Sequence, residues 1–222
     1  MNKQELIEYI DNNILLGNIV REDSPVVKYI LDDMDRNLGF YVNDPYQSVG
    51  CVCIDDRFYI KKDGENKIHL VHYVGDEEEI DLGDYVDIID SDAFRMSKHI
   101  KYVAGKTVVK LDAFSFSRTK IKDINFPNLQ EIGYGSFGQT YLLENITLNK
   151  IKVIPKSTFF LSKIKSFRGD EVEVVEEESF DACENLEELI LPKVKKYPKK
   201  MRLYDRDKDK FIYIKMKNFL KR

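Results

Sequence analysis

Residues 132–141, IGYGSFGQTY, place three glycines in the spacing G-x-G-x-x-G, at Gly133, Gly135 and Gly138. In protein kinases and dinucleotide-binding folds this spacing lets the backbone approach nucleotide phosphates. A kinase would also need H-R-D and D-F-G elements, and neither occurs in the 84 residues after Gly138. No helix of useful length follows the glycines, as a dinucleotide-binding motif requires. We therefore expect no nucleotide site.

Two histidines and two cysteines lie close together in the sequence without forming a recognisable site. His69 and His72 flank an apolar pair in IHLVHY and would point to opposite faces of a strand. Cys51 and Cys53 fall on one face of the apolar run VGCVCI, as small core residues do. Three cysteines in the whole chain fit neither a disulfide framework nor a four-ligand zinc site. We predict no bound metal and no cofactor.

No nucleophile can be paired with a base in a known catalytic motif, so we predict that the chain is not an enzyme. Arg168-Gly169-Asp170 spells an integrin-binding tripeptide, but it ends a strand-like phrase. The first residues, MNKQELIEYIDNN, are amphipathic and acidic, which is not typical of a secretory signal. We therefore expect a cytoplasmic protein in which the tripeptide has no adhesive role.

The composition is that of a globular protein with segregated charge. A chain of 222 residues with 43% hydrophobic content can bury a core, and its apolar stretches are far shorter than the ~20 residues of a membrane span. The net charge of −4 conceals an asymmetry, because residues 193–222 hold 13 Lys and Arg against 3 Asp and Glu. This asymmetry predicts an acidic partner for the basic segment or internal pairing with acidic residues. The internal candidates are Glu171, Glu173, Glu176, Glu177 and Glu178.

The strongest pattern is a repeat with a period of 21 or 22 residues. A phenylalanine recurs at this spacing, and aliphatic residues stand five and eight positions before each copy. After each phenylalanine comes a strand-like phrase whose central apolar residue keeps the same spacing. The four series are Phe94, Phe116, Phe137, Phe159 and Phe180; Ile89, Leu111, Ile132, Ile154 and Val175; Val86, Val108, Leu129, Ile151 and Val172; and Val103, Ile124, Ile146, Phe167 and Leu189.

Each unit is interpreted as one coil of a solenoid. The strand-like phrase alternates between apolar and polar residues, which predicts a strand with one buried face. The later aliphatic residues and the phenylalanine would fill the turn, and coils would stack because no unit can bury its apolar edge alone. In this register Ile132 and Phe137 are core positions, and Gly133 and Gly135 occupy free sites between them. The repeat therefore explains the glycine motif.

The phrases SFDACENLEELILPKV (residues 179–194) and AFRMSKHIKYV (residues 93–103) resemble BspA-type leucine-rich repeats. That family's pattern, A-F-x-x-C-x-x-L-x-x-I-x-L-P with an aliphatic-rich turn, is followed over about residues 80–200. The chain departs from it because only Cys183 matches the family's cysteine and the proline appears only at Pro127 and Pro192. Aliphatic residues also replace the asparagine of ordinary leucine-rich repeats. The resemblance implies a solenoid that binds partners on its strand side.

We predict an α+β protein with three parts. Residues 1–78 form a small domain with helices around residues 6–15 and 24–34, followed by strands in GFYV, VGCVCI, RFYIKK and KIHLVHYV. The last two strands would be joined by a hairpin at residues 63–66. Residues 79–200 form a leucine-rich-repeat solenoid of about five 21–22-residue units. Residues 201–222 form a basic cap with FIYI as a capping strand and a polar turn at residues 205–209.

The outward residues of the strand-like phrases are expected to bind a protein partner. Their mixed charges lack the uniform positive stripe and stacked aromatics that favour nucleic acid. Charges of both signs can instead orient a protein partner. The predicted partner-binding residues are Lys101, Tyr102, Lys122, Asp123, Asn125, Glu144, Asn145, Lys165, Arg168, Glu187 and Glu188.

Two further hypotheses concern the partner. The alternative function is binding of nucleic acid or a nucleoprotein by the basic C-terminal segment, whose lysines surround Tyr204, Phe211, Tyr213 and Phe219. A narrower form of the protein-binding hypothesis is that the chain is an accessory protein of a phage or mobile element that inhibits a host defence complex. In either case no membrane partner is expected.

Overall fold

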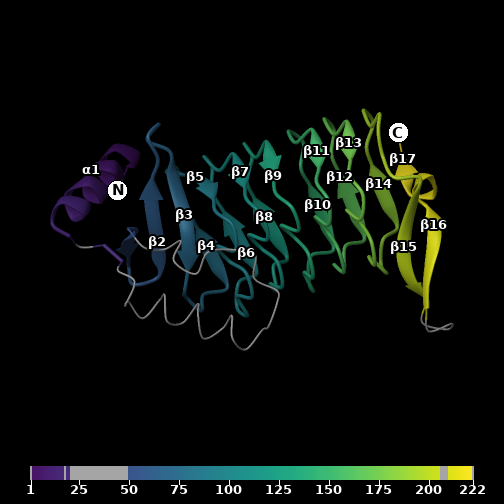
Figure 1. Ribbon diagram of the computed structural model, residues 1–222, viewed down its shortest axis with the longest axis horizontal. Coiled ribbons are helices and arrows are strands. Elements are labelled where there is room, and N and C mark those ends of the chain that lie inside the picture. Colours follow the sequence, from purple (N-terminus) through teal and green to yellow (C-terminus); the bar gives the residue numbers. More distant parts are fainter. Residues whose placement is uncertain (1, 18, 21–49, 206–209, 222) are drawn as a thin grey trace.

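A computed structural model describes residues 2–17, 19–20, 50–205 and 210–221. They form an elongated β-solenoid with a short helix at one end and a strand hairpin at the other (Figure 1). This confirms the predicted α+β fold, in which a small N-terminal α+β region is followed by a solenoid and a C-terminal capping strand. The predicted helix at residues 24–34, the strand GFYV and most of the turn at residues 205–209 lie outside the described residues. None of the described helices has the length and apolar character needed to cross a membrane.

Helix α1 (Lys3–Leu15) begins with a capping box. The Asn2 side chain accepts the backbone N–H of Glu5, and the Glu5 carboxylate accepts the backbone N–H of Asn2, both at 2.9 Å. Leu6 and Ile10 are fully buried in the core that the helix shares with the strands. Two further residues of the predicted apolar stripe are instead exposed: Ile14 and Leu15.

Three antiparallel strands connect the helical end to the solenoid: β1 (Val52–Ile54), β2 (Phe58–Lys62) and β3 (Ile68–Tyr73). The predicted hairpin between β2 and β3 is confirmed. Its turn is held by the Asp63 carboxylate, which accepts the backbone N–H groups of Glu65 and Lys67 at 2.8 and 2.9 Å. Strand β3 then pairs in parallel with β5, so the antiparallel strands and the first coils share one sheet.

The solenoid has two rows of parallel strands. The first row continues from β3 through β5 (Val86–Ile89), β7 (Lys110–Leu111), β9 (Glu131–Ile132), β11 (Val153–Ile154) and β13 (Val174–Val175). The second row contains β4 (Glu79–Asp81), β6 (Tyr102–Ala104), β8 (Asp123–Asn125), β10 (Asn145–Thr147), β12 (Ser166–Arg168) and β14 (Glu188–Ile190). The second row is the predicted strand of each repeat. The first row forms where only a turn was expected, because the segment between the two aliphatic positions is extended enough to pair with its neighbour.

A stack of aromatic rings runs through the core. The ring centroids of the five repeated phenylalanines are 4.9, 5.7, 5.5 and 5.2 Å apart in sequence order, and the largest interplanar angle is 18°. Tyr73 precedes this stack by one period, with its centroid 5.4 Å from that of Phe94. The backbone N–H of Tyr73 donates to the carbonyl of Ala93 in the next coil. The N–H of Phe94 donates to the carbonyl of Ser115 in the same way. The repeat therefore begins one unit earlier than expected.

The repeated apolar residues form one continuous core. All the phenylalanines and aliphatic residues of the four series are buried except Ile124 of β8, which is partly exposed. The same core includes Leu6 of α1 and Met216 near the C-terminal end. Coil therefore packs on coil throughout, as expected for units that cannot bury their apolar edges alone. The boundaries at residues 78/79 and 200/201 stay a prediction.

The prediction that Gly133 and Gly135 occupy free sites is wrong. A Cβ atom at Gly133 would lie 2.5 Å from backbone atoms of Asp112 and Ala113 in the preceding coil. Gly135 has a φ of +59°, and a Cβ atom there would lie 2.6 Å from the ring of Phe114. Close packing between coils thus explains why glycine suits both positions.

The last coil is closed by an antiparallel hairpin of β15 (Lys200–Asp205) and β16 (Lys210–Lys215). The backbone N–H of Ala182 donates to the carbonyl of Arg202, and the N–H of Arg202 donates to the Asp181 carboxylate at 2.9 Å. Predicted FIYI lies in β16. A single 3-10 turn (Met216–Asn218) leads to β17 (Leu220–Lys221), which pairs with β14 and extends the second row.

Candidate partner-binding face

The second strand row presents its outward side chains in lines that cross the coils. We call the outward surface of β4, β6, β8, β10, β12, β14 and β17 the strand face. In these strands the central residue faces the core and the residues on either side face outward. Parallel pairing puts Glu79, Tyr102 and Asp123 in one line, and Asp81, Ala104 and Asn125 in a second.

Six of the predicted partner-binding residues lie in strands of this face, and the other five directly precede one of its strands: Lys101, Lys122, Glu144, Lys165 and Glu187. Lys101, Lys165 and Glu188 are partly exposed. The other eight are exposed: Tyr102, Lys122, Asp123, Asn125, Glu144, Asn145, Arg168 and Glu187. Their role in binding stays a prediction.

Several of these charges are already paired within the chain. Lys165 lies 2.8 Å from Glu144 in the neighbouring coil, and Lys101 pairs in the same way with Glu78. The hydrogen bond from Lys101 lowers the pKa of Glu78, and the bond to Glu144 raises the pKa of Lys165. Arg168 lies 2.8 Å from Asp170, and Glu188 pairs with Lys221. Exposed pairs contribute little to stability, but they neutralise much of the C-terminal half of the face.

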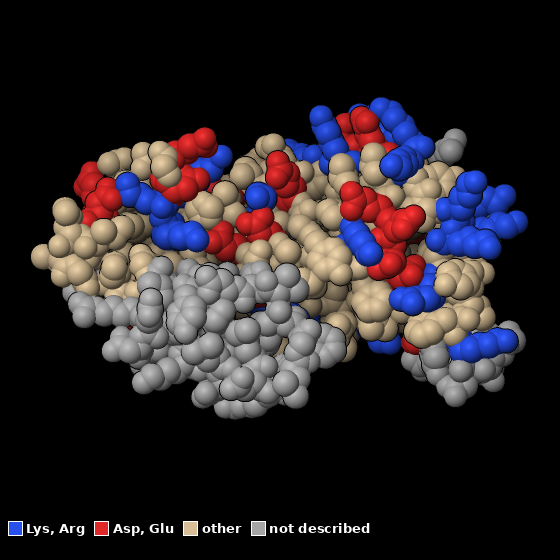
Figure 2. All heavy atoms as spheres, viewed as in Figure 1, with Lys and Arg blue, Asp and Glu red and all other residues tan. Residues whose placement is uncertain are grey.

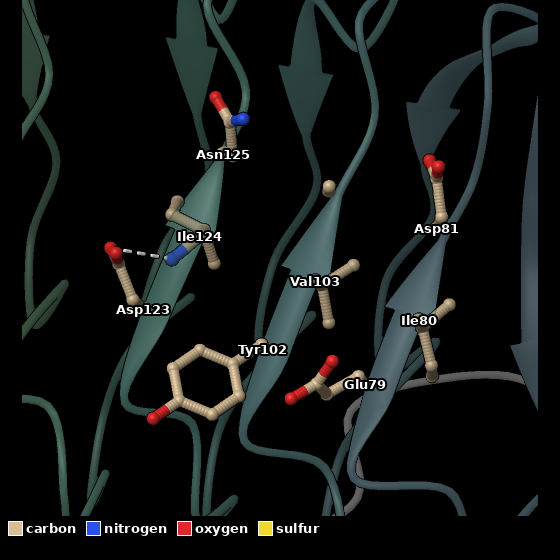
Figure 3. Close-up of a pocket in the computed structure, with 9 residues that line it drawn as sticks. Glu79, Ile80, Asp81, Tyr102, Val103, Asp123, Ile124 and Asn125 are labelled. Atoms are coloured by element: carbon tan, nitrogen blue, oxygen red, sulfur yellow. Dashed lines mark hydrogen bonds between the residues drawn. The ribbon is translucent and has the colours of Figure 1, made fainter.

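A shallow hollow of about 410 Å³ lies over β4, β6 and β8 (Figure 3). The carboxylate of Glu79 points toward Tyr102, and the Tyr102 ring extends from β6 toward β8. Tyr102 is 41% exposed. The residues that face outward around the hollow are Glu79, Asp81, Tyr102, Ala104, Asp123 and Asn125.

The hollow carries carboxylates that no cation of the described residues pairs with. No ion pair joins Glu79, Asp81 or Asp123 to a cation in the described part of the chain. An Asp81 oxygen accepts the N–H of Gly83, and an Asp123 oxygen accepts the N–H of Ile124, both at 2.8 Å. Backbone donors thus orient two of the three carboxylates without neutralising them.

Positive charge gathers at the opposite end of the molecule. Figure 2 shows Lys and Arg side chains covering the end that carries β15 and β16. Tyr213 and Phe211 of β16 are 67% and 48% exposed among these cations. Six exposed lysines make no ion pair with a carboxylate of the described residues: Lys196, Lys199, Lys200, Lys210, Lys215 and Lys217.

Part of the basic segment is paired with acidic residues of the same chain. Internal pairing was one of the two alternatives that the charge distribution predicted. Lys195 lies 2.8 Å from Glu173, and Lys193 lies 2.5 Å from Glu171. The hydrogen bond from Lys195 lowers the pKa of Glu173. Lys156, from outside the segment, is instead the ion-pair partner of Glu178. Internal pairing therefore accounts for the start of the basic segment and for Arg202 of the hairpin, which lies 3.4 Å from Asp181, whereas Lys200, Lys210 and Lys215 make no ion pair with the described residues.

His69, Cys51 and Cys183 are held by a local hydrogen bond or by burial. His69 Nδ1 lies 2.6 Å from the Asp90 carboxylate, and this hydrogen bond raises the pKa of His69. Burial raises the pKa of Cys51 and of Cys183 to about 12, so both thiols are protonated and poorly nucleophilic. No three His, Cys, Asp or Glu side chains of the described residues come together in a group that could hold a metal ion.

Sequence reasoning missed Glu79 and Asp81 as residues of the face. The phrase around residues 79–81 precedes the first unit that carries a phenylalanine, so its acidic residues were not assigned to the face. The available signal was Ile80, which lies 23 residues before Val103 and pairs with it. Tyr73 in the phenylalanine position would have identified the extra unit.

Comparison with known proteins places the repeat in a family. A family model described as "BspA type Leucine rich repeat region (6 copies)" matches residues 73–187. No curated protein matches the sequence. A leucine-rich repeat protein from Eubacterium ventriosum has a similar structure, with 13% identity and a TM-score of 0.52 over 72% of this chain and 47% of that one. This chain thus spans about half the length of that protein.

Two other solved structures give weaker matches. The pneumococcal vaccine antigen PcpA is 16% identical, with a TM-score of 0.45 over 67% of this chain and 44% of that one. A leucine-rich cell surface protein from Faecalibacterium prausnitzii is 14% identical, with a TM-score of 0.39 over 72% of this chain and 59% of that one.

Proposed function

Because the chain belongs to the family of BspA-type leucine-rich repeat proteins, we propose that it is a non-enzymatic module that binds a protein partner through its strand face. Repeat solenoids commonly serve as scaffolds for protein interaction, since stacked coils align side chains over a long surface. The observation that carries the proposal is the hollow over β4, β6 and β8, where outward side chains surround an open, unbalanced charge.

The chemistry of the face supports a protein ligand. Its charges have both signs, and many are paired between neighbouring coils, so no continuous cationic track runs along it. Unpaired carboxylates and an exposed tyrosine together suit a partner surface with complementary charge. Tyrosine also supplies contact area with little loss of conformational entropy on binding.

The proposal is tested by an affinity pull-down from host lysate with two matched double variants. Asn125→Arg/Thr147→Arg places two bulky cations on β8 and β10 of the strand face. Gln130→Arg/Val153→Arg places the same added charge on the first strand row of the same two coils. All four wild-type side chains are exposed, so both variants should fold.

We expect a protein that wild type and the Gln130/Val153 variant both retain and that the Asn125/Thr147 variant loses. Circular dichroism and thermal unfolding of each variant establish that it is folded. Capture of no specific protein by wild type, or equal capture by both variants, would refute binding through the strand face.

A second candidate function is nucleic-acid binding by the β15–β16 hairpin. It is favoured by Lys200, Lys210 and Lys215 of the hairpin, which have no ion pair in the described residues, and by exposed Tyr213 on the same hairpin. Cations that neutralise phosphates make affinity fall steeply with salt, and an aromatic ring can stack on a base.

The second function is tested by titrating a labelled single-stranded oligonucleotide at two salt concentrations. Lys200→Gln/Lys210→Gln/Lys215→Gln should weaken binding and flatten the salt dependence. Lys101→Gln/Lys150→Gln/Lys152→Gln removes as many positive charges elsewhere and is the control. Equal loss in both variants would indicate attraction by net charge alone.

Location and partner identity are further proposals. We propose a cytoplasmic location, which is supported by three cysteines that are all free. The narrower hypothesis of a phage or mobile-element inhibitor of a host defence complex stays a prediction.

A further inference from the structure

We propose that the hollow over β4, β6 and β8 receives a cationic, extended segment of the protein partner, with one Arg or Lys side chain lying over the Tyr102 ring between Glu79 and Asp123. This inference rests on the proposed function and specifies which part of the strand face is used and by what chemistry.

The size of the hollow suits side chains of a peptide. Its volume of about 410 Å³ falls in the range of small ligand pockets. Neighbouring strands are about 4.8 Å apart, so Glu79 and Asp123, two strands apart, are separated by roughly 10 Å. Alternate residues of an extended segment are about 7 Å apart, which lets two long cationic side chains reach both carboxylates.

The charge of the hollow selects the sign of the ligand. Glu79, Asp81 and Asp123 have no ion-pair partner in the described part of the chain, and all three are exposed. Like charges on β4 and β8, roughly 10 Å apart, repel one another, and a bound cation between them relieves that repulsion. An anionic ligand would increase it.

The tyrosine provides the second part of the site. The Lys122 ammonium lies 6.0 Å from the centroid of the Tyr102 ring, so the chain's own cation already approaches this ring. No carboxylate of the described residues pairs with Lys122. A partner cation would compete with Lys122 for the ring, and removal of Lys122 should therefore strengthen binding.

The rest of the strand face lacks this combination. In the C-terminal half, Arg168 and Glu188 are held in ion pairs with Asp170 and Lys221. Among the described residues, Glu187 is the one acidic residue in this half of the face that has no ion pair. The strand face therefore has one acidic region with an exposed aromatic ring, and it lies at the hollow.

The test measures fluorescence anisotropy of a labelled, alternating Gly-Arg peptide about nine residues long. Glu79→Gln/Asp123→Asn neutralises two carboxylates of the hollow. Glu131→Gln/Glu177→Gln neutralises two exposed carboxylates outside the strand face and is the matched control. A Gly-Glu peptide of equal length controls for the sign of the ligand.

We expect the hollow variant to bind about tenfold more weakly than wild type and the control variant to stay within about twofold. Tyr102→Leu should also weaken binding, and Lys122→Met should strengthen it several-fold. Equal losses in the two double variants, no binding by wild type, or tighter binding of the Gly-Glu peptide would overturn the inference.

The natural partner separates this inference from the proposed function. One outcome would support the proposed function and refute this inference. In that outcome, wild type and Glu79→Gln/Asp123→Asn both retain the partner fully, whereas Asn125→Arg/Thr147→Arg loses it. The strand face would then bind the partner without using the acidic hollow. If wild type retains no partner, the proposed function itself fails.

A second copy of this chain is the competing occupant, because its hairpin is also cationic. Sedimentation equilibrium of wild type and Glu79→Gln/Asp123→Asn distinguishes the two. A monomer at all concentrations supports a foreign cationic segment. An oligomer that the hollow variant abolishes would overturn the inference in favour of a second copy.

Discussion

His69 and His72 of β3 lie in opposite electrostatic environments. His69 gains a carboxylate partner in Asp90, and its raised pKa gives stability that is present below the unfolded pKa of 6.5 and lost as pH rises through the folded pKa. The Nε2 atom of His72 is shielded from water and has no hydrogen-bond partner, although the residue as a whole is partly exposed. Burial lowers the pKa of His72 to about 4.

His72 makes the protein less stable in mild acid. The unfolded chain binds a proton at this residue below pH 6.5, whereas the folded chain does so only near pH 4. Stability is therefore lost as pH falls from 6.5 to about 4, by up to about 3 kcal/mol from this residue. Urea unfolding at several pH values should show a smaller acid-induced loss for His72→Gln than for wild type. An unchanged pH dependence would mean that the imidazole titrates normally in the folded protein.

Gly133 illustrates how closely two coils approach. A Cβ atom there meets backbone 2.5 Å away, and backbone cannot move aside as a flexible side chain can. We expect Gly133→Ala to destabilise the fold by about 1–3 kcal/mol in chemical unfolding. Gly64→Ala is the control, because no atom lies within 4 Å of the equivalent position in the β2–β3 turn. Equal effects of the two substitutions would contradict close packing at Gly133.

At the scale of elements, each coil turns at its phenylalanine through two residues in the left-handed conformation. They lie two positions before and two positions after the phenylalanine and recur with the repeat. All but one of these residues are not glycine, and the left-handed conformation costs a non-glycine residue roughly 1–2 kcal/mol. The members are Asp92, Phe114, Gly135, Ser157 and Glu178, and Met96, Arg118, Gln139, Leu161 and Ala182.

Relief of this strain should stabilise the protein. Leu161 has a φ of +57° and is 40% exposed, so its side chain gives up little burial when replaced. We expect Leu161→Asn to raise the free energy of unfolding by about 0.5–1 kcal/mol, because asparagine tolerates the left-handed region. Leu142→Asn, at a position with similar exposure and no positive φ, should bring no gain. A loss at Leu161 would show that its side chain contributes more packing than its exposure suggests.

The sequence predicted the coils better than their internal details. A strict apolar spacing identifies the residues that face the core, and nearly all of them are buried. It did not reveal the first strand row, because strands of two residues have no alternation to detect. It also missed the close approach at Gly133, since contact between neighbouring coils depends on backbone positions that spacing does not specify.

At the scale of the whole molecule, the stack of coils is interrupted between β8 and β10. Both strand rows lose their pairing at this one junction, since β9 and β11 are also unpaired. The aromatic stack continues across it, with Phe137 and Phe159 centroids 5.5 Å apart. Ile124, the partly exposed core residue, borders the same junction. Coils on either side are therefore held together at the phenylalanine edge while the strand rows separate.

This junction should open more readily than its neighbours. Hydrogen exchange followed by NMR measures how often each backbone amide opens. The amides to compare are those on the C-terminal side of the junction, which have no acceptor in the preceding coil, and the equivalent amides one coil later, which donate to the carbonyls of Glu144 and Lys152. We expect faster exchange for Glu144, Asn145, Lys152 and Val153 than for Lys165, Ser166, Glu173 and Val174. Uniform protection across both coils would show that the junction is as tightly closed as the others.

The candidate site was predictable in outline. The register indicated which residues face outward on the strand side, and each predicted residue is exposed or partly exposed and lies in a strand of that side or directly before one. Spacing alone could not show that Lys165 and Arg168 are paired within the chain or that the acidic hollow begins one unit earlier, at Glu79. Pairing between coils depends on side-chain length and reach, which become visible only in three dimensions.

The most direct test of the central claim, that the strand face binds the partner, is site-specific photo-crosslinking in host cells. A benzophenone amino acid at Asn125 would report on the strand face beside the hollow, and the same amino acid at Gln130 would report on the other strand row of the same coil. The account predicts a discrete crosslinked protein from position 125 and none from position 130. A crosslinked protein from position 130 alone would contradict it.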